Sequence, residues 1–337
     1  MSDDSLLRLD AVVKHFPVRR GAVVRRDAGQ VHAVDGVTLD VRRGETLGLV
    51  GESGCGKSTL ARCIAGLHPV SSGRILFDGE DITNLPARRM RPYRRRIQMI
   101  FQDPYGSLNP RRRVGSVIGD PLAIHRVASG EDRKRRVQEL MELVGLNPEH
   151  YNRFPAEFSG GQRQRIGIAR ALALRPDLVI CDEPVSALDV SIQAQVVNLL
   201  TDLQHELGLT YVFIAHDLSV VQHVSTKVAV MYLGKVVEVG DAATLYRAAR
   251  HPYSRALLSA VPVADPDRAE GRERIVLRGD VPTPLDPPSG CRFHPRCPRA
   301  GEGCDVVEPP LVGAPLAAAC HYPVEVGEQV AATGRSR

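Results

Sequence analysis

Residues 51–59 have the residue types and the spacing of a phosphate-binding loop. They read Gly-Glu-Ser-Gly-Cys-Gly-Lys-Ser-Thr and fill every fixed position of the pattern G-x-x-x-x-G-K-[ST]. The apolar run 46–50 precedes the loop and the helix-compatible segment 60–67 follows it, so the loop joins a strand to a helix. In that setting the backbone N–H groups and the helix N-terminus attract phosphate oxygens. The segment therefore predicts binding of a nucleoside triphosphate, with ATP as the expected ligand.

Each residue of this loop has a predicted part in binding the nucleotide. Lys57 can reach the β- and γ-phosphates, and the Ser58 hydroxyl can ligate Mg²⁺. Cys55 is expected to contribute its backbone rather than its thiol. The predicted nucleotide-binding residues of the loop are Gly51, Glu52, Ser53, Gly54, Cys55, Gly56, Lys57, Ser58 and Thr59.

Two acids follow a second apolar run, which begins at residue 178. Residues 178–184 read Leu-Val-Ile-Cys-Asp-Glu-Pro, which is typical of a buried parallel strand that ends in carboxylates. Asp182 is placed to hold Mg²⁺, directly or through water, and Glu183 can polarise a water in line with the γ-phosphate. Another apolar strand is predicted at 211–215, directly before His216, and Gln102 closes a strand at 97–101.

The order of these segments resembles the ATP-binding subunits of ABC transporters. The matching elements are the Walker A loop (51–59), the Q-loop Gln102, the signature (158–162), the Walker B segment (178–183), the D-loop (186–189) and the switch His216. The usual first signature residue in the family is Leu, and Phe158 replaces it here by another apolar side chain.

The resemblance implies that two such subunits clamp two ATP molecules head to tail. Each nucleotide then lies between the Walker A loop of one subunit and the signature of the other, so that Ser159, Gly160, Gly161 and Gln162 bind ATP. The implied catalytic residues are Glu183, His216 and Gln102, and the implied Mg²⁺ ligands are Ser58, Gln102 and Asp182. A packing role in the core is the alternative for His216.

An aromatic residue is also expected against the adenine. Phe16 lies in the apolar stretch 9–18 and resembles the family's adenine-stacking position, although a single Phe can equally be a core residue. The basic segment 19–30 between this stretch and the loop is interpreted as an insertion in loop conformation, because it carries glycines at 21 and 29.

The alternation of strand-like and helix-like segments up to residue 245 predicts an α/β fold with a parallel sheet. The resemblance implies a P-loop NTPase fold, with a RecA-like parallel core, additional antiparallel strands and an inserted helical subdomain at about 103–163. We expect an ATPase domain at 1–245. A small loop-rich C-terminal domain is expected at 246–337, where Pro is dense and the periodicity fades.

Residues 251–258, His-Pro-Tyr-Ser-Arg-Ala-Leu-Leu, resemble the oligopeptide and dipeptide permease type of importer, as do 33–37 and 44–48. The latter two segments look like the second of its two ATPase subunits. The implied function is an ATPase that powers peptide uptake. The implied partners are a second, different ATPase subunit, two transmembrane permeases and an extracytoplasmic peptide-binding protein.

Nickel and sugar importers use similar ATPases, so the transported solute stays open. A non-transport ABC ATPase is disfavoured by the single Walker A, the single signature and the lack of heptads.

Charge and hydropathy limit the classes of partner and the cellular locations that fit this chain. The net charge is +5, and the basic runs at 88–89, 94–96, 111–113 and 133–136 suggest either nucleic-acid contact or solvated faces. Aromatic residues that could stack on bases are scarce among these arginines, Tyr93 being one, which favours solvated faces and no nucleic-acid partner. The apolar runs are too short for a membrane helix, and the N-terminus lacks a signal-peptide core. We therefore expect a soluble subunit that attaches to the cytoplasmic face of the membrane through the permeases.

Four cysteines close to one another near the C-terminus suggest a metal centre. They are Cys291, Cys297, Cys304 and Cys320. We expect the protein in the cytoplasm, where reducing conditions disfavour disulfides, so four cysteines close in sequence indicate metal binding. Four thiolates suit either a [4Fe–4S] cluster or a structural zinc ion, with His294 or His321 as substitute zinc ligands. Prolines beside Cys297 and near Cys320 resemble iron–sulfur loops, which favours the cluster over zinc and over a metal-free tail.

Overall fold

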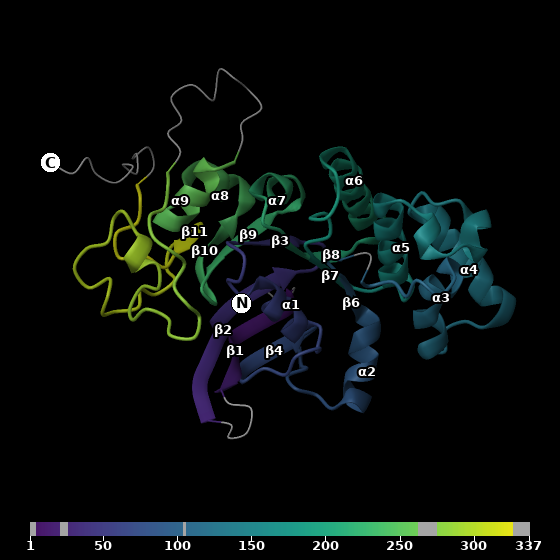
Figure 1. Ribbon diagram of the computed structural model, residues 1–337, viewed down its shortest axis with the longest axis horizontal. Helices are drawn as coiled ribbons and strands as arrows, with labels where there is room; N and C mark the ends of the chain where they lie inside the picture. Colours follow the sequence, from purple (N-terminus) through teal and green to yellow (C-terminus); the bar gives the residue numbers. More distant parts are fainter. Residues whose placement is uncertain (1–4, 21–25, 104–105, 262–274, 326–337) are drawn as a thin grey trace, which may run out of the picture. The chain divides into compact units, whose positions relative to one another are not determined.

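The computed structural model contains two compact units and describes residues 5–20, 26–103, 106–261 and 275–325 (Figure 1). Unit 1 contains Val41–Thr46 and Asn84–Ala215. Unit 2 contains Leu6–Asp40, Leu47–Thr83 and the described residues from His216 onward. The predicted acidic pair thus belongs to unit 1, and the predicted phosphate loop belongs to unit 2.

Short apolar strands form a parallel sheet at the centre of unit 1. The strands β6 (Ile97–Ile100), β7 (Leu178–Asp182) and β8 (Thr210–Ile214) pair side by side in parallel. Every residue of β7 and β8 is buried, which is the pattern that parallel strands show. The parallel sheet predicted from these apolar runs is confirmed.

Helices account for most of the remaining structure in unit 1. Those described are α2 (Ala87–Arg96), α3 (Val114–Ile124), α4 (Gly130–Leu143), α5 (Gly160–Leu172) and α6 (Val190–Leu207), with the short 3-10 turns η1 (Pro148–Asn152) and η2 (Pro155–Glu157). Helix α3 packs against both α4 and α5 through buried side chains such as Ile118 and Val137. Helices α3 and α4 lie within the range of about 103–163 where a helical subdomain is expected.

Unit 2 contains the strand that leads into the phosphate loop. Strand β3 (Thr46–Val50), which enters unit 2 at Leu47, pairs in parallel with β9 (Lys227–Tyr232). Strand β10 (Lys235–Asp241) is antiparallel to β9, and the short β11 (Leu316–Ala318) is antiparallel to β10. The C-terminal region therefore adds a strand to the sheet that carries the loop.

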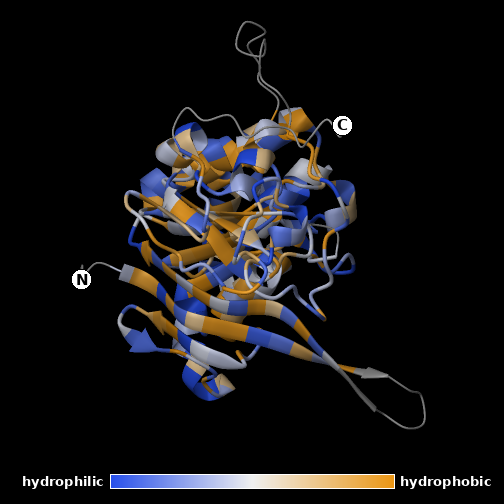
Figure 2. Ribbon diagram, turned by 90° about the vertical axis from the view of Figure 1, so that its left-hand side faces the viewer, coloured by the Kyte–Doolittle hydropathy of each residue, from blue (hydrophilic) through white to orange (hydrophobic). Residues whose placement is uncertain are grey.

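A second sheet of unit 2 has the order β2-β1-β4-β5. Its strands are β1 (Ser5–Arg20), β2 (Arg26–Arg42), β4 (Ser72–Phe77) and β5 (Glu80–Asp81). Hydrophobic and hydrophilic residues alternate along the long strands β1 and β2, as one buried face requires (Figure 2). The prediction of a loop over 19–30 was wrong at its edges, because β1 continues to Arg20 and β2 begins at Arg26; residues 21–25 lie outside the described residues.

The helices of unit 2 are short. They are α1 (Lys57–Ile64), α7 (Leu218–Val224), α8 (Ala242–Ala248) and α9 (Pro252–Ser259), with the 3-10 turn η3 (His294–Arg296). Helix α1 begins at Lys57, ahead of the predicted start at residue 60, because Gly56 turns the backbone with a φ of 109°. In the part of the chain that the structure describes, no helix is both long and apolar enough to cross a membrane.

Candidate nucleotide-binding site

The phosphate loop in unit 2 has the strand–loop–helix form that its sequence predicts. Two of its glycines are required by space and by backbone angle. A Cβ on Gly51 (φ 150°) would lie 2.2 Å from the Met231 carbonyl oxygen, and one on Gly56 would lie 2.0 Å from that of Ala33. Real Cβ atoms do not approach backbone so closely, so a side chain at either position would displace the loop.

Lys57 and Cys55 occupy the positions in this loop that their predicted roles need. The Lys57 ammonium group donates to the carbonyl oxygens of Gly51 (2.7 Å) and Glu52 (3.0 Å), which places it over the loop. Cys55 is 4% exposed, and burial raises the pKa of its thiol despite the nearby ammonium. The Cys55 carbonyl accepts from the Gly234 N–H at 2.8 Å, so its backbone takes part in the loop structure. Ser53, Gly54, Ser58 and Thr59 lie in the same loop and first helical turn, and their ligand contacts stay predictions.

Phe16 and His216 also lie in unit 2, and neither is a buried core residue. Phe16 is half-buried on β1, with the ring of His68 edge-on at a centroid distance of 5.6 Å and the Lys14 ammonium 4.6 Å from its centroid. Burial, followed by the charges of Arg62 and Lys14, lowers the pKa of His68. His216 is exposed, immediately before the cap of α7. Because neither side chain is fully buried, a role in the core is disfavoured for both, and their contacts with nucleotide stay predictions.

In unit 1 the structure brings together Gln102 and Glu183. The Gln102 Nε2 donates to Glu183 Oε2 at 2.7 Å, just beyond the carboxyl end of β7. Asp182 is the last residue of β7 and is 1% exposed. Glu183 has a φ of 48°, which is uncommon for a residue with a side chain and costs conformational energy. Its N–H donates to the Ile214 carbonyl at 3.0 Å, which fixes the turn that presents the carboxylate.

The signature forms the N-terminus of α5 in unit 1. The Ser159 Oγ accepts from the Gln162 N–H (3.3 Å), and the Gln162 Oε1 accepts from the Ser159 N–H (3.0 Å). This reciprocal capping leaves both side chains exposed at the helix end. A Cβ on Gly161 would lie 2.5 Å from the Ile192 side chain, so glycine is needed there, whereas one on Gly160 would meet Leu188 at an ordinary 3.4 Å. Phe158 is buried and has the His150 ring edge-on, consistent with the predicted apolar exchange.

Sequence reasoning missed two residues that contact the phosphate loop. The Tyr253 hydroxyl accepts from the Glu52 N–H at 2.8 Å, and Arg296 forms an ion pair with the Glu52 carboxylate. Both come from the C-terminal region, far from the loop in sequence. Tyr253 lies in the segment 251–258 that resembles the peptide importers, and Arg296 lies in the short turn Phe-His-Pro-Arg between two cysteines. Neither position indicates a contact with the phosphate loop.

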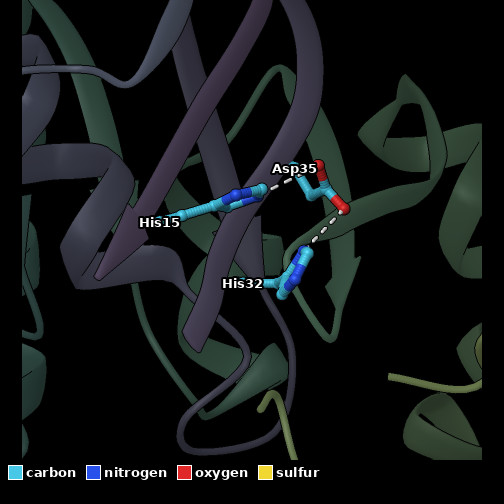
Figure 3. A group of neighbouring side chains, drawn as sticks. All are labelled: His15, His32 and Asp35. Atoms are coloured by element: carbon cyan, nitrogen blue, oxygen red, sulfur yellow. Dashed lines mark hydrogen bonds and ion pairs between the residues drawn. The ribbon is translucent and has the colours of Figure 1, made fainter. Parts of the chain in front are cut away.

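A second group of polar side chains lies where β1 and β2 meet in unit 2. His15 Nε2 lies 3.3 Å from Asp35 Oδ1 and His32 Nδ1 lies 3.5 Å from Asp35 Oδ2 (Figure 3). Arg292 also donates to Asp35 Oδ2 and, with Lys235 and His15, it lowers the pKa of this carboxyl against the opposing effect of burial. Cations already surround the single carboxylate, so we interpret the group as an anchor for Arg292 of the C-terminal region.

Comparison with known proteins places the chain among transporter ATPases. Residues 34–186 match the ABC transporter family and residues 237–304 match the oligopeptide/dipeptide transporter C-terminal region. The oligopeptide transport ATP-binding protein AppF of Bacillus subtilis is 54% identical over 90% of this chain and 92% of its own length. OppF of Salmonella typhimurium is 53% identical (91% and 93%), and the dipeptide transport ATP-binding protein DppF of Escherichia coli is 50% identical (91% and 90%).

Solved structures agree on the fold. The ATP-binding cassette MJ0796, in a dimeric post-hydrolysis state with ADP and Pi, has a TM-score of 0.62 at 29% identity, covering 70% of this chain and 98% of that one. The cbiO1 subunit of the cbiONQ transporter of Clostridium perfringens has a TM-score of 0.61 at 27% identity, covering 72% and 91%. The predicted P-loop NTPase fold is confirmed.

The predicted [4Fe–4S] cluster is corrected by these relatives, because iron–sulfur centres are not a feature of AppF, OppF or DppF. Among the described residues, no three of the four thiols lie within 4.8 Å of one another, whereas the sulfurs around one zinc ion are about 3.8 Å apart. Burial raises the pKa of Cys297 to about 12 and of Cys320 to about 11, and the other thiols of the group contribute to both increases. The four cysteines Cys291, Cys297, Cys304 and Cys320 are free thiols, of which Cys304 is buried and the other three are half-buried.

The chain covers nine-tenths or more of the length of these relatives, with half or more of the aligned residues identical. It belongs to the family of ABC transporter ATP-binding subunits with an oligopeptide/dipeptide transporter C-terminal region.

Proposed function

We propose that this chain hydrolyses ATP to power the import of peptides across a membrane. The observation that carries the proposal is the 2.7 Å contact between Gln102 and Glu183, beside a buried Asp182, in a chain with an intact phosphate loop. The Glu183 carboxylate can orient the attacking water. The Gln102 amide can respond to the presence or absence of the γ-phosphate. The peptide-transport relatives support the solute class.

The proposed residue roles follow from the chemistry of each side chain. Lys57 and the loop amides hold the phosphates, Phe16 stacks on the adenine, and the signature Ser159–Gln162 serves the nucleotide held by a partner subunit. Ser58, Gln102 and Asp182 offer only oxygen donors, which suit Mg²⁺. That ion neutralises phosphate charge when bound. Glu183 orients the attacking water, and His216 stabilises the γ-phosphate group.

The proposed partners are a second, different ATPase subunit, two transmembrane permeases and an extracytoplasmic peptide-binding protein. The dimeric state of the structurally similar MJ0796 cassette supports pairing of ATPase subunits. We place the subunit on the cytoplasmic face of the membrane, attached through the permeases. We also propose that residues 1–245 are the ATPase domain, with its helical subdomain at about 103–163, and that 246–337 are a C-terminal domain.

Uptake into vesicles by the reconstituted transporter tests this function. Labelled di- and oligopeptides should accumulate when ATP is supplied, and uptake should be lost when this subunit carries Glu183→Gln. The vesicles could instead accumulate nickel or a sugar, with the same dependence on ATP and Glu183. That result would support ATP-driven import by this subunit and contradict peptides as the transported solute.

A further inference from the structure

Glu52, the second residue of the phosphate loop, is held at three points within unit 2. Its N–H donates to the Tyr253 hydroxyl at 2.8 Å, and its carbonyl accepts from the Lys57 ammonium at 3.0 Å. Its carboxylate takes two hydrogen bonds from Arg296, Nη1 to Oε2 at 2.7 Å and Nη2 to Oε1 at 3.1 Å. Two of these three holds come from the C-terminal region, so the shape of the loop depends on it.

The ion pair with Arg296 is sheltered from water. The Arg296 side chain is 7% exposed and that of Glu52 is 26% exposed. The bidentate contact raises the pKa of the guanidinium, with a smaller contribution from the Tyr232 hydroxyl at 3.4 Å. A guanidinium fork matches a carboxylate in geometry as well as in charge, and removal of one partner leaves the other charge partly desolvated and unpaired.

The residues that precede Arg296 fix its place. Phe293 is fully buried, with ring centroids of Tyr232 at 5.2 Å and Tyr253 at 5.3 Å. Arg292 donates to the Leu233 carbonyl and to Asp35, the carboxylate drawn in Figure 3. The segment from Arg292 to Arg296 is therefore docked through an apolar anchor and two arginines, and the fold brings the second guanidinium to Glu52.

The contact has an electrostatic consequence for the reaction. Glu52 carries a carboxylate in the loop that must receive a polyanion, and a free carboxylate there repels phosphate. We propose that Arg296 is a positioning residue for ATP binding, which neutralises Glu52 and holds the phosphate loop in the shape that receives the nucleotide. The C-terminal region thereby sets the nucleotide affinity of the subunit, a role beyond the ATPase activity itself.

Charge variants of the pair test this assignment. Arg296→Gln should weaken Mg-ATP binding by the full chain about tenfold, because it leaves the Glu52 charge unpaired beside the phosphates. Arg296→Lys should lie between this variant and the wild type, because it keeps the charge without the fork. Glu52→Gln combined with Arg296→Gln should recover most of the affinity. In the assembled transporter, Arg296→Gln should raise the KM for ATP and leave kcat at saturating ATP nearly unchanged.

The matched control is Arg74→Ala, which breaks an ion pair with Asp10 in the same unit, where the arginine side chain is 63% exposed. It should bind Mg-ATP like the wild type. If Arg296→Gln proves unstable on thermal melting, the affinity of the Glu52→Gln/Arg296→Gln double variant still tests the proposal, because that variant has no unpaired charge. Wild-type affinity in Arg296→Gln, or equal losses in the single and double variants, would overturn the assignment.

Discussion

Glu183 combines a positive φ, a hydrogen bond from Gln102 and a place directly after a buried aspartate. The backbone strain is retained because the turn presents the carboxylate beyond the strand end. The acidic pair was predictable from sequence, since two acids after an apolar run have few other uses. The contact with Gln102 was not, because it joins residues far apart in sequence through the register of β6 and β7.

Glu183→Gln should keep ATP binding and remove most hydrolysis, because an amide cannot polarise the water while the phosphate-loop contacts stay intact. We expect a loss of about a hundredfold or more in kcat, measured as phosphate release by the assembled transporter. The variant should accumulate as an ATP-loaded dimer on size exclusion. Turnover near the wild-type rate would remove Glu183 from its role.

Lys57→Ala should act at an earlier step and weaken ATP binding itself, since the ammonium group compensates phosphate charge before and during the reaction. A titration with a fluorescent ATP analogue measures the loss. Lys57→Ala should therefore lose ATP affinity, whereas Glu183→Gln should lose hydrolysis and keep its affinity. Equal losses of affinity in the two variants would contradict these separate roles.

His251 gives the C-terminal region a dependence on pH. It is fully buried, and its Nδ1 accepts the Tyr253 N–H at 3.1 Å, so the native state holds the neutral ring. Burial lowers its pKa from 6.5 to about 3. Between these values the unfolded chain binds the proton and the folded chain does not, so stability falls as the pH drops below 6.5.

We expect a loss of about 1 kcal/mol per pH unit below that value. Urea unfolding at pH 7 and at pH 5 measures it, and His251→Gln should flatten the pH dependence. An equal slope in the variant and the wild type would exclude His251 as the source.

At the scale of elements, the phosphate loop depends on the two glycines whose Cβ positions are filled by backbone. The strand before the loop and the helix after it followed from periodicity. The early start of α1 at Lys57 did not, because it depends on the left-handed turn at Gly56. The long strands β1 and β2 were also underestimated, since basic residues between them resemble a loop.

Gly56→Ala should abolish ATP binding, because its Cβ would overlap the Ala33 carbonyl at 2.0 Å and its φ of 109° is strained. Gly54→Ala is the matched control in the same loop. It has a φ of 78° but nothing within 4 Å of its Cβ, so it should cost only about 1–2 kcal/mol of backbone strain. Calorimetric titration with Mg-ATP compares the two. Equal affinities in both variants would show that the close approach at Gly56 is not limiting.

At the scale of the whole molecule, one chain supplies a phosphate loop and a signature, and the family resemblance places each of these on a different nucleotide. The isolated chain should therefore hydrolyse ATP slowly, and its rate should rise steeply when a partner ATPase subunit and the permeases are added. Phosphate release measured across a concentration series checks this. Full activity that is independent of concentration would contradict a shared site.

The order of the motifs indicated two family matches in separate parts of the chain, the ABC transporter family at residues 34–186 and the oligopeptide/dipeptide transporter C-terminal region at 237–304. The four cysteines near the C-terminus predicted an iron–sulfur cluster, and this prediction was wrong, because such a cluster is not a feature of the homologous peptide-transport subunits. The sequence also could not show that Arg292 contacts Asp35 or that Arg296 contacts Glu52, because these pairs are far apart in the chain and meet only in the folded unit 2.

Cys55 sits in the middle of the phosphate loop, yet its thiol is 4% exposed and burial raises its pKa. Alkylating reagents attack the exposed thiolate, so this cysteine should be nearly inert to maleimides. Cys181 is fully buried and should behave in the same way. A maleimide should therefore leave the nucleotide loop unmodified. Cys291, Cys297 and Cys320 are half-buried and would have to be replaced first. Spectroscopic labels on cysteines introduced at the surface could then follow the motion of the subunit during transport while Cys55 and Cys181 are kept.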